Sequence, residues 1–202
     1  EMHLFFSHLV WISQIDNYET INNNLKKFIY DQKENSPKGV HKSNISGWHS
    51  EQFDLQDDNL KSFLNALKPK IEEAIIDMGW DIKNQIVKIT SMWSIINKKN
   101  SFNEKHHHGN SALSAAYYVK ADQDSGDIVF YDPRHAFIFA HPEASKINEL
   151  NAQVKSITPK AGTLVLFPSF LEHSVKPSQS DDDRIVISFN ISLIHKRYLN
   201  QN

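Results

Sequence analysis

The chain of 202 residues contains no cysteine. Disulfides, thiolate zinc sites, iron–sulfur clusters and a cysteine nucleophile are therefore excluded, and any metal must be held by His, Asp or Glu. Clusters of basic residues are also lacking, because the formal net charge is -2 and residues of both signs are interspersed. This charge pattern argues against a nucleic-acid partner.

Long hydrophobic runs are missing as well. The most apolar stretch, MHLFFSHLVWIS near the start, is too short for a membrane span and lacks the basic start of a signal peptide. We therefore expect a strand there, in a cytoplasmic protein with no membrane partner. With 40% hydrophobic and 23% charged residues, the chain suits one domain over residues 1–202. Residues 1–84 would form an N-terminal strand and helical scaffold, and residues 85–195 a β core with the functional site.

Two helices are expected in the first part of the chain. Asp16 can cap a helix whose apolar residues recur at helical spacing, namely Ile21, Leu25, Phe28 and Ile29. A second helical pattern follows Asp57 and ends at Gly79, and Pro69 is expected to kink or divide it. Between the helices, residues 32–47 are predicted to form a polar loop. Trp48 and His49 come next and receive no role.

Beyond Gly79 the hydrophobic period changes from 3.6 to 2. Strands separated by turn residues are predicted, with no helix between them, at Ile86–Asn97, Leu113–Lys120, Asp127–Tyr131, Ala136–Ala140, Gln153–Ile157, Thr163–Phe167 and Arg184–Leu193. This pattern favours a mainly β fold with N-terminal helices. The best match is a double-stranded β-helix, a jelly roll or cupin-like core, buttressed by the two helices.

Three consecutive histidines lie just before one of these strands. In an extended chain His106 and His108 point to one side and His107 to the other, so the first two can share a metal ion. His173 stands at the start of another expected strand, about 65 residues downstream. The alternative for the three consecutive histidines is a solvated polar patch.

An arginine begins the last expected strand, RIVISFNISL. Arg184, Val186, Ser188 and Asn190 share one face of that strand by parity. An arginine on an inward face needs an anionic partner. The alternative is a surface ion pair with the nearby acidic run at residues 181–183, which would contribute little to stability.

Four segments together carry a resemblance to a known family. They are HHHGNSALSAAYYVK, YDPR, GTLVLFPSFLEH and RIVISFN, and they span roughly Trp93 to Leu193. In these segments the chain resembles the Fe(II)/2-oxoglutarate-dependent oxygenases of the prolyl-hydroxylase-like group. It is most similar to a small bacterial and phage family of 2-oxoglutarate-Fe(II) oxygenases.

The resemblance implies a role for individual residues. His106, His108 and His173 would be the metal ligands and form the catalytic centre, with Fe(II) as the cofactor. Arg184 would anchor the distal carboxylate of 2-oxoglutarate, because a guanidinium offers two parallel hydrogen bonds to a carboxylate. Tyr118 would donate its phenol to the same carboxylate.

Ser188 lies on the same strand face as Arg184 and is expected to add a hydroxyl to the 2-oxoglutarate site. The family pattern has a carboxylate as second metal ligand, whereas this sequence offers His108 there. Three neutral imidazoles would leave the site one negative charge short. Glu104 shares the parity of His106 and is the second choice for a carboxylate ligand.

The implied activity is a 2-oxoglutarate-dependent dioxygenase that hydroxylates an unidentified substrate, a protein side chain or a small molecule, and releases succinate. A homodimer is left open. A cupin-like metal-binding module or isomerase that does not use 2-oxoglutarate is one alternative, and a structural jelly roll with incidental histidines is another. Arg184 and Tyr118 favour the oxygenase, because a module that binds only a metal needs no buried carboxylate anchor.

Overall fold

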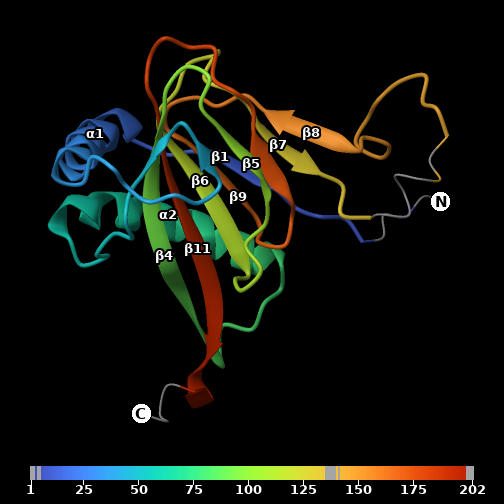
Figure 1. Cartoon of the computed structure of the whole chain (residues 1–202). Helices are drawn as coiled ribbons and strands as arrows, with labels where there is room; N and C mark the ends of the chain where they lie inside the picture. The colour runs from blue at the N-terminus through green and yellow to red at the C-terminus, as the bar shows by residue number, and fades with distance from the viewer. Residues whose placement is uncertain (1–2, 4–5, 135–139, 141, 199–202) are drawn as a thin grey trace.

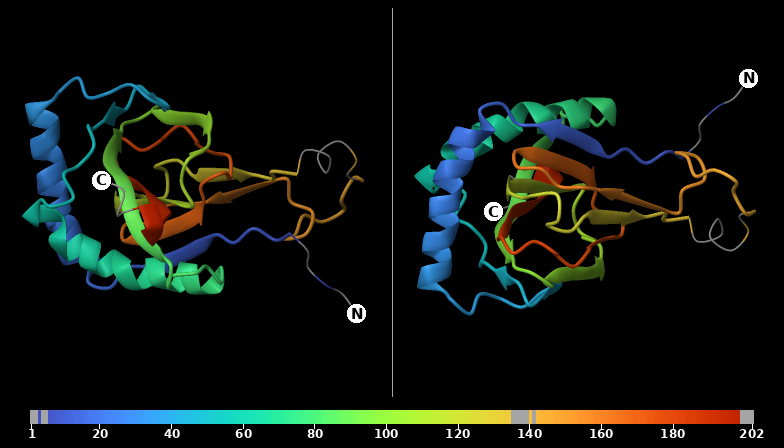
Figure 2. Two further views of the ribbon diagram at one scale, coloured as in Figure 1. Left: turned by 90° about the horizontal axis from the view of Figure 1, so that it is seen from below. Right: turned by 90° about the horizontal axis from the view of Figure 1, so that it is seen from above.

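The computed structural model describes residues 3, 6–134, 140 and 142–198. Within them the chain forms two antiparallel sheets that face each other as the layers of a jelly roll, with two helices along the outer face of the larger sheet (Figures 1 and 2). The larger sheet has the order β1-β9-β6-β11-β4-β3 and the smaller one β2-β5-β10-β7-β8. The mainly β, jelly-roll prediction is confirmed.

The strands have the following bounds: β1 Trp11–Gln14, β2 Asn44–Ile45, β3 Trp48–His49, β4 Gln85–Asn97, β5 Phe102–His106, β6 Leu113–Lys120, β7 Ile128–Tyr131, β8 Val154–Ile157, β9 Thr163–Pro168, β10 His173–Val175 and β11 Arg184–His195. Six of them, β4, β6, β7, β8, β9 and β11, lie where period-2 patterns predicted them. The predicted strand Ala136–Ala140 lies outside the described residues, apart from Ala140.

Strand β11 lies between β4 and β6 and pairs with β4 along its whole length. Its side chains alternate between the two faces of the larger sheet, as a pleated strand requires. One face contributes four apolar residues to the core beneath the helices, namely Ile185, Ile187, Phe189 and Ile191. The other face lines a cavity between the sheets, with Arg184, Val186, Ser188 and Asn190.

Helix α1 spans Tyr18–Asn35 and begins one residue later than Asp16 would place it. Its N-cap residue is Asn17, which has a left-handed backbone (φ 53°) and makes no side-chain cap hydrogen bond. The predicted capping role of Asp16 is therefore wrong. Asparagine tolerates the left-handed region better than most residues, so the chain turns into the helix there.

Helix α2 spans Asp58–Asp77 and begins after Asp57 as predicted, where the Asp57 carboxylate caps it by accepting a hydrogen bond from the backbone N–H of Asn59 at 2.9 Å. The predicted division at Pro69 is wrong, since the helix continues through it. Pro69 is exposed, so water can solvate the carbonyl that loses its partner. Leu67 and Ile71 on either side are buried in the core and hold the turn in place.

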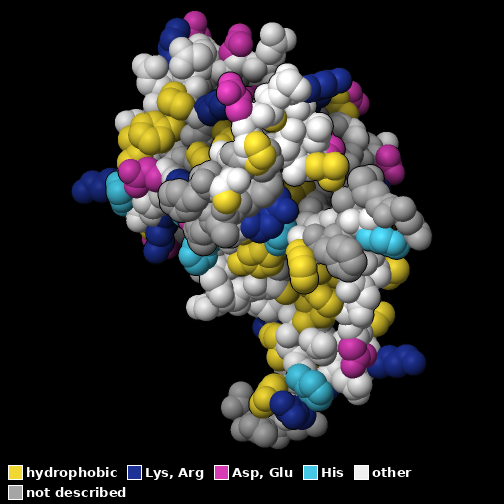
Figure 3. Space-filling view, turned by 90° about the vertical axis from the view of Figure 1, so that its right-hand side faces the viewer, with side chains coloured by type: hydrophobic (Ala, Val, Ile, Leu, Met, Phe, Trp, Pro, Cys, Tyr) yellow, Lys and Arg dark blue, Asp and Glu magenta, His cyan; other side chains and the backbone are white. Residues whose placement is uncertain are grey.

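The N-terminal apolar run was predicted as one strand, but among its described residues pairing begins at Trp11, in β1 (Trp11–Gln14), which pairs with β9. Among the described residues, no helix is both long and apolar enough to span a bilayer. Basic and acidic side chains are interspersed on the face of the molecule shown in Figure 3, as the sequence indicates.

Strand β5 was not predicted from the sequence, and it carries His106, one of the histidines of the candidate site.

Candidate metal and 2-oxoglutarate site

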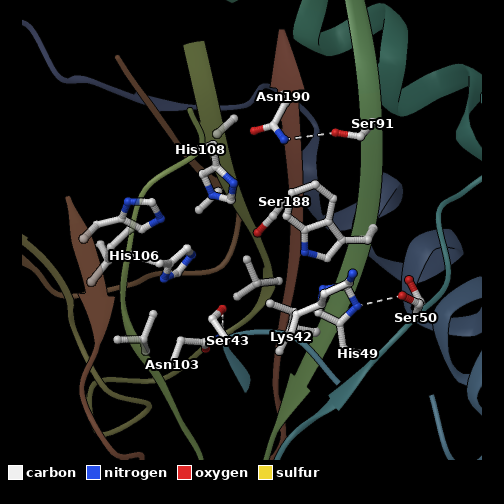
Figure 4. Close-up of a pocket in the computed structure, with 18 of the residues that line it drawn as sticks. Lys42, Ser43, His49, Ser50, Ser91, Asn103, His106, His108, Ser188 and Asn190 are labelled. Carbon is white, nitrogen blue, oxygen red and sulfur yellow. Dashed lines mark hydrogen bonds between the residues drawn. The ribbon is translucent and has the colours of Figure 1, made fainter. Parts of the chain in front are cut away.

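Three histidines meet at the mouth of the jelly roll. His106 ends β5, His173 begins β10, and the two are cross-strand partners in the smaller sheet. His108 lies two residues beyond β5, where its backbone N–H donates to the carbonyl of Ser169 at 2.8 Å. One ring nitrogen of each histidine lies within 4.8 Å of the others, whereas the exposed His107 is not part of the group. Figure 4 shows His106 and His108 turned toward the cavity.

Two of these rings are oriented by backbone carbonyls. The Nδ1 atom of His106 lies 2.7 Å from the Glu104 carbonyl oxygen, and Nδ1 of His173 lies 3.0 Å from that of Leu171. Because a carbonyl oxygen only accepts, each Nδ1 carries the proton and each Nε2 keeps a lone pair. This arrangement is typical of metal-binding histidines, whose second nitrogen is fixed by an outer hydrogen bond.

Burial keeps the three imidazoles neutral. Desolvation lowers the pKa of His173 to about 3, with a further lowering by His106 and His108. Desolvation likewise lowers the pKa of His108 to about 4 and also lowers that of His106. Neutral imidazoles are the form that binds a metal, and imidazole suits iron, zinc, copper and nickel. The donor set therefore fits a divalent transition metal, Fe(II) included.

Arg184 is buried in the same cavity, 2% exposed. Its Nη1 donates to the carbonyl oxygen of Gly126 at 3.1 Å and more weakly to that of Ser125 at 3.5 Å. Its Nε is buried without a partner among the described residues. Burial lowers the pKa of Arg184, which reflects the cost of a charge in this environment. The guanidinium is therefore prepared for an anionic ligand from outside the chain.

The surface ion pair considered as an alternative for Arg184 is not formed. Asp181 pairs with Lys99, and Asp182 pairs with Lys120. The carboxylate of Asp183 accepts a hydrogen bond from the Tyr30 hydroxyl on α1. Arg134, the arginine of the YDPR segment, forms an ion pair with Asp132 and does not line the cavity.

Tyr118 and Ser188 lie in the same cavity, which has a volume of about 650 Å³. The Arg184 guanidinium carbon lies 6.0 Å from the centre of the Tyr118 ring. Burial raises the pKa of Tyr118 to about 12, so its hydroxyl stays a hydrogen-bond donor at neutral pH. Ser188 extends from β11 toward the cavity, two residues from Val186 and four from Arg184 on the same face (Figure 4).

Glu104 is exposed, and no carboxylate joins the histidine group in the part of the chain that the structure describes. What Glu104 contributes is its backbone carbonyl, which orients His106. The geometry thus favours His108 over Glu104 as the third donor. The assignment of the individual ligands stays a prediction.

Sequence reasoning missed His49 and Trp93. His49 is only 7% exposed, and its ring stacks on Trp93 with centroids 5.7 Å apart and 10° between the planes. The Trp93 ring lies 5.8 Å from that of His108, so it connects His49 with the metal site. The parity of β4 would have placed Trp93 on the cavity face. No local pattern placed His49 there, because β3 is only two residues long.

Comparison with known proteins agrees with this geometry. Residues 91–190 match the model of the family described as "Putative 2OG-Fe(II) oxygenase". No curated protein sequence matches the chain. Among solved structures, a Pseudomonas putida prolyl-4-hydroxylase is 14% identical over 92% of this chain and 93% of its own, with a TM-score of 0.66.

Two further structures show the same fold. A prolyl hydroxylase from Trichoplax adhaerens, solved with a hypoxia inducible factor peptide, is 13% identical over 96% of this chain and 87% of its own (TM-score 0.63). HygX from Streptomyces hygroscopicus, solved with nickel and 2-oxoglutarate, is 10% identical over 91% of this chain and 82% of its own (TM-score 0.63). Through residues 91–190 the chain belongs to the 2OG-Fe(II) oxygenase family and is a 2-oxoglutarate-dependent non-haem iron dioxygenase.

Proposed function

We propose that this 2-oxoglutarate-dependent dioxygenase hydroxylates its substrate at a site where His106, His108 and His173 hold the metal and Arg184 anchors the cosubstrate. One observation carries the proposal. A group of three neutral imidazoles and a buried arginine without a carboxylate partner line the same cavity. Each half of the cavity fits something that the chain does not supply, a metal cation for the histidines and an anion for the arginine.

When bound, Fe(II) with 2-oxoglutarate supplies the oxidation of a C–H bond, coupled to decarboxylation of 2-oxoglutarate to succinate. The chain's own residues position the reactants. The Glu104 and Leu171 carbonyls fix the ring orientation of two histidines through Nδ1, which leaves their Nε2 atoms as the nitrogens that would bind the metal. The free Nε of Arg184 would donate to the distal carboxylate of 2-oxoglutarate.

Tyr118 and Ser188 would complete the anchor for that carboxylate. The buried phenol of Tyr118 remains protonated because its pKa is raised to about 12, so it donates and does not repel the anion. The apolar walls beside it, including Phe167 and Val186, exclude water and strengthen each hydrogen bond to the charged ligand. A metal-only module would gain nothing from this buried, positively charged end of the cavity.

The test is anaerobic titration of the protein with Fe(II) and 2-oxoglutarate, followed by visible absorption. We expect the weak charge-transfer band of the 2-oxoglutarate chelate to develop to saturation, and succinate to form once air is admitted. His173→Ala is expected to abolish the band, whereas the exposed His107→Ala should keep it. A saturating titration without any band would refute the proposal, and a band that survives in His173→Ala would refute the ligand assignment.

A further inference from the structure

The cavity has a second group of polar side chains that neither the metal nor 2-oxoglutarate would occupy. This second subsite comprises Lys42, His49, Glu51 and Ser91, all of which line the cavity. Figure 4 shows Lys42, His49 and Ser91 on the β4 side, across the cavity from His106. A backbone hydrogen bond of 2.9 Å from Val40 to the His49 carbonyl holds the segment that carries Lys42 against β3.

His49 presents a hydrogen-bond acceptor to this subsite. Its Nδ1 lies 2.7 Å from the carbonyl oxygen of Ser50, so Nδ1 carries the proton and donates. The other ring nitrogen, Nε2, is then a bare lone pair, and it faces the cavity (Figure 4). Burial lowers the pKa of His49, which supports the neutral form. A ligand here must supply an N–H or O–H group.

Ser91 presents a donor, and a row of hydrogen bonds across three strands fixes its direction. Ser114 has one hydroxyl proton and donates it to Asn190 Oδ1 at 2.8 Å, so it accepts from Ser169 at 2.8 Å. Asn190 in turn donates its Nδ2 to Ser91 Oγ at 3.0 Å. Ser91 therefore accepts from inside the protein, and its own proton is available to the cavity.

Lys42 and Glu51 add one charge of each sign at the same rim. Both side chains are exposed, both act electrostatically on His49, and neither has an ion-pair partner among the described residues. In particular, the two are not paired with each other. A rim with a separated cation and anion, a neutral acceptor and a hydroxyl donor is complementary to a small zwitterion.

We propose that the second subsite binds the primary substrate, and that this substrate is a free α-amino acid. Its carboxylate would pair with Lys42, and its ammonium would donate to His49 and Glu51. Ser91, four residues along β4 from the Ile95 that pairs with His49, would donate to an acceptor on the side chain of the amino acid. An internal residue of a polypeptide has neither charged group, so it would leave both rim charges unpaired. This inference rests on the proposed function, because it assigns the substrate class of the same site.

The experiment uses protein loaded with Ni(II) and 2-oxoglutarate, which keeps the site filled but unreactive. Each of the common L-amino acids is titrated by calorimetry, and any that binds is compared with its N-acetyl amide. We expect at least one free amino acid to bind, and its blocked form to bind at least about tenfold more weakly. Equal binding of the blocked form, or binding of a blocked peptide alone, would point to a polypeptide substrate and overturn the proposal.

Variants locate the binding to the second subsite. Lys42→Met and Glu51→Gln should each weaken amino-acid binding by about three- to fivefold, the magnitude of a partly solvated ion pair. His49→Phe keeps an aromatic ring on Trp93 but removes the acceptor, and it should have a similar effect. The matched controls Lys61→Met and Glu73→Gln change exposed charges on α2 and should have none. Rim variants that bind like the parent would overturn the assignment.

The 2-oxoglutarate titration distinguishes this inference from the proposed function. If the Ni(II) protein takes up 2-oxoglutarate but no free amino acid, only the substrate assignment fails. If 2-oxoglutarate itself does not bind, the proposed function fails first. In the three rim variants the affinity for 2-oxoglutarate should equal that of the parent, because Arg184 and Tyr118 are untouched.

Discussion

The two faces of β11 differ in almost every property although they belong to the same twelve residues. Toward the helices, Ile185, Ile187 and Phe189 are fully buried among apolar neighbours. Toward the cavity, Arg184 has an unpartnered Nε, and Ser188 lies beside open space. The two environments stay separate because successive side chains of a β-strand point to opposite faces of the sheet.

The difference separates what stabilises the fold from what binds ligands. The helix-facing side chains remove apolar surface from water and stabilise the chain by themselves. A buried guanidinium without an anion costs stability, and the two carbonyl contacts of Arg184 compensate this cost only in part until an anionic ligand binds. Substitutions on the first face should therefore change unfolding, and substitutions on the second should change binding.

The largest expected effect is on the helix-facing side. Phe189→Ala should lower the free energy of unfolding by about 3 to 5 kcal/mol, because Phe189 is fully buried and its removal leaves a cavity between β11 and the helices. The measurement is urea unfolding of the metal-free protein. The fraction that remains folded should bind 2-oxoglutarate with the affinity of the parent.

Phe189→Leu is the matched control, since it keeps most of the volume and should lose much less stability. A Phe189→Ala protein with normal stability but weakened 2-oxoglutarate binding would contradict the division between the two faces.

The next largest effect is on the cavity-facing side. Arg184→Ala removes one partner of a desolvated, charge-assisted contact, which costs about 2 to 5 kcal/mol of 2-oxoglutarate binding, a rise in Kd of roughly 30-fold or more. Metal content should stay intact, because Arg184 is not part of the histidine group. Calorimetric titration of 2-oxoglutarate into the Ni(II) protein measures the change.

Arg134→Ala serves as the control for the loss of an arginine. Arg134 is half-exposed, paired with Asp132 and outside the cavity, so its removal should leave the affinity for 2-oxoglutarate unchanged. The opposite result, with Arg184→Ala binding normally and Arg134→Ala binding weakly, would move the anchor to the YDPR segment.

The difference between the two faces of β11 also explains how much of the fold and of the candidate site could be predicted from the sequence. Period-2 runs located β4, β6, β9 and β11 and the parity of Arg184 and Ser188, because burial on one face imposes that pattern directly. The convergence of histidines from positions 106, 108 and 173 followed only from a resemblance of combined motifs. Spacing alone does not say that β5 and β10 are neighbours.

Features set by tertiary contacts were not predictable in this way. Strand β5 is polar and short, and β3 has two residues, so neither shows a periodic pattern. The helix start at Asn17 depends on a left-handed backbone, and the unbroken passage through Pro69 depends on the core on either side of it. His49 enters the cavity only because β3 pairs with β4, which no local pattern reveals.

A smaller effect is expected at the proposed metal site, where His108 would take the place of a carboxylate ligand. His108→Asp should still bind Fe(II) and retain it to lower pH than the parent, as measured by iron content against pH with 2-oxoglutarate present. The sign follows from charge, since an anionic ligand attracts the cation more strongly and protons then displace it only at a higher concentration.

The shift should be modest because burial lowers the pKa of His108 to about 4, so protons already compete weakly for the histidine, and the same burial would raise the pKa of an aspartate at this position. His108→Ala is expected to lose most of its iron. Glu104→Gln is the control, since its side chain is exposed and only its backbone carbonyl contacts His106. If Glu104→Gln loses the metal while His108→Ala keeps it, the ligand assignment is wrong.

The smallest expected effect returns to the cavity face of β11. Ser188→Ala removes one hydroxyl beside the proposed 2-oxoglutarate site and leaves Arg184 and Tyr118 in place. A single hydrogen bond of this kind contributes about 0.5 to 1.5 kcal/mol, so Kd for 2-oxoglutarate should rise by roughly two- to tenfold. Ser192→Ala, on the same strand but outside this cavity, should leave Kd unchanged.

The free energy of unfolding of Ser188→Ala should hardly differ from that of the parent, because Ser188 is only partly buried and is not part of the apolar core. If Ser188→Ala instead destabilises the protein while binding 2-oxoglutarate normally, the hydroxyl belongs to the scaffold, and the functional face of β11 ends at Val186.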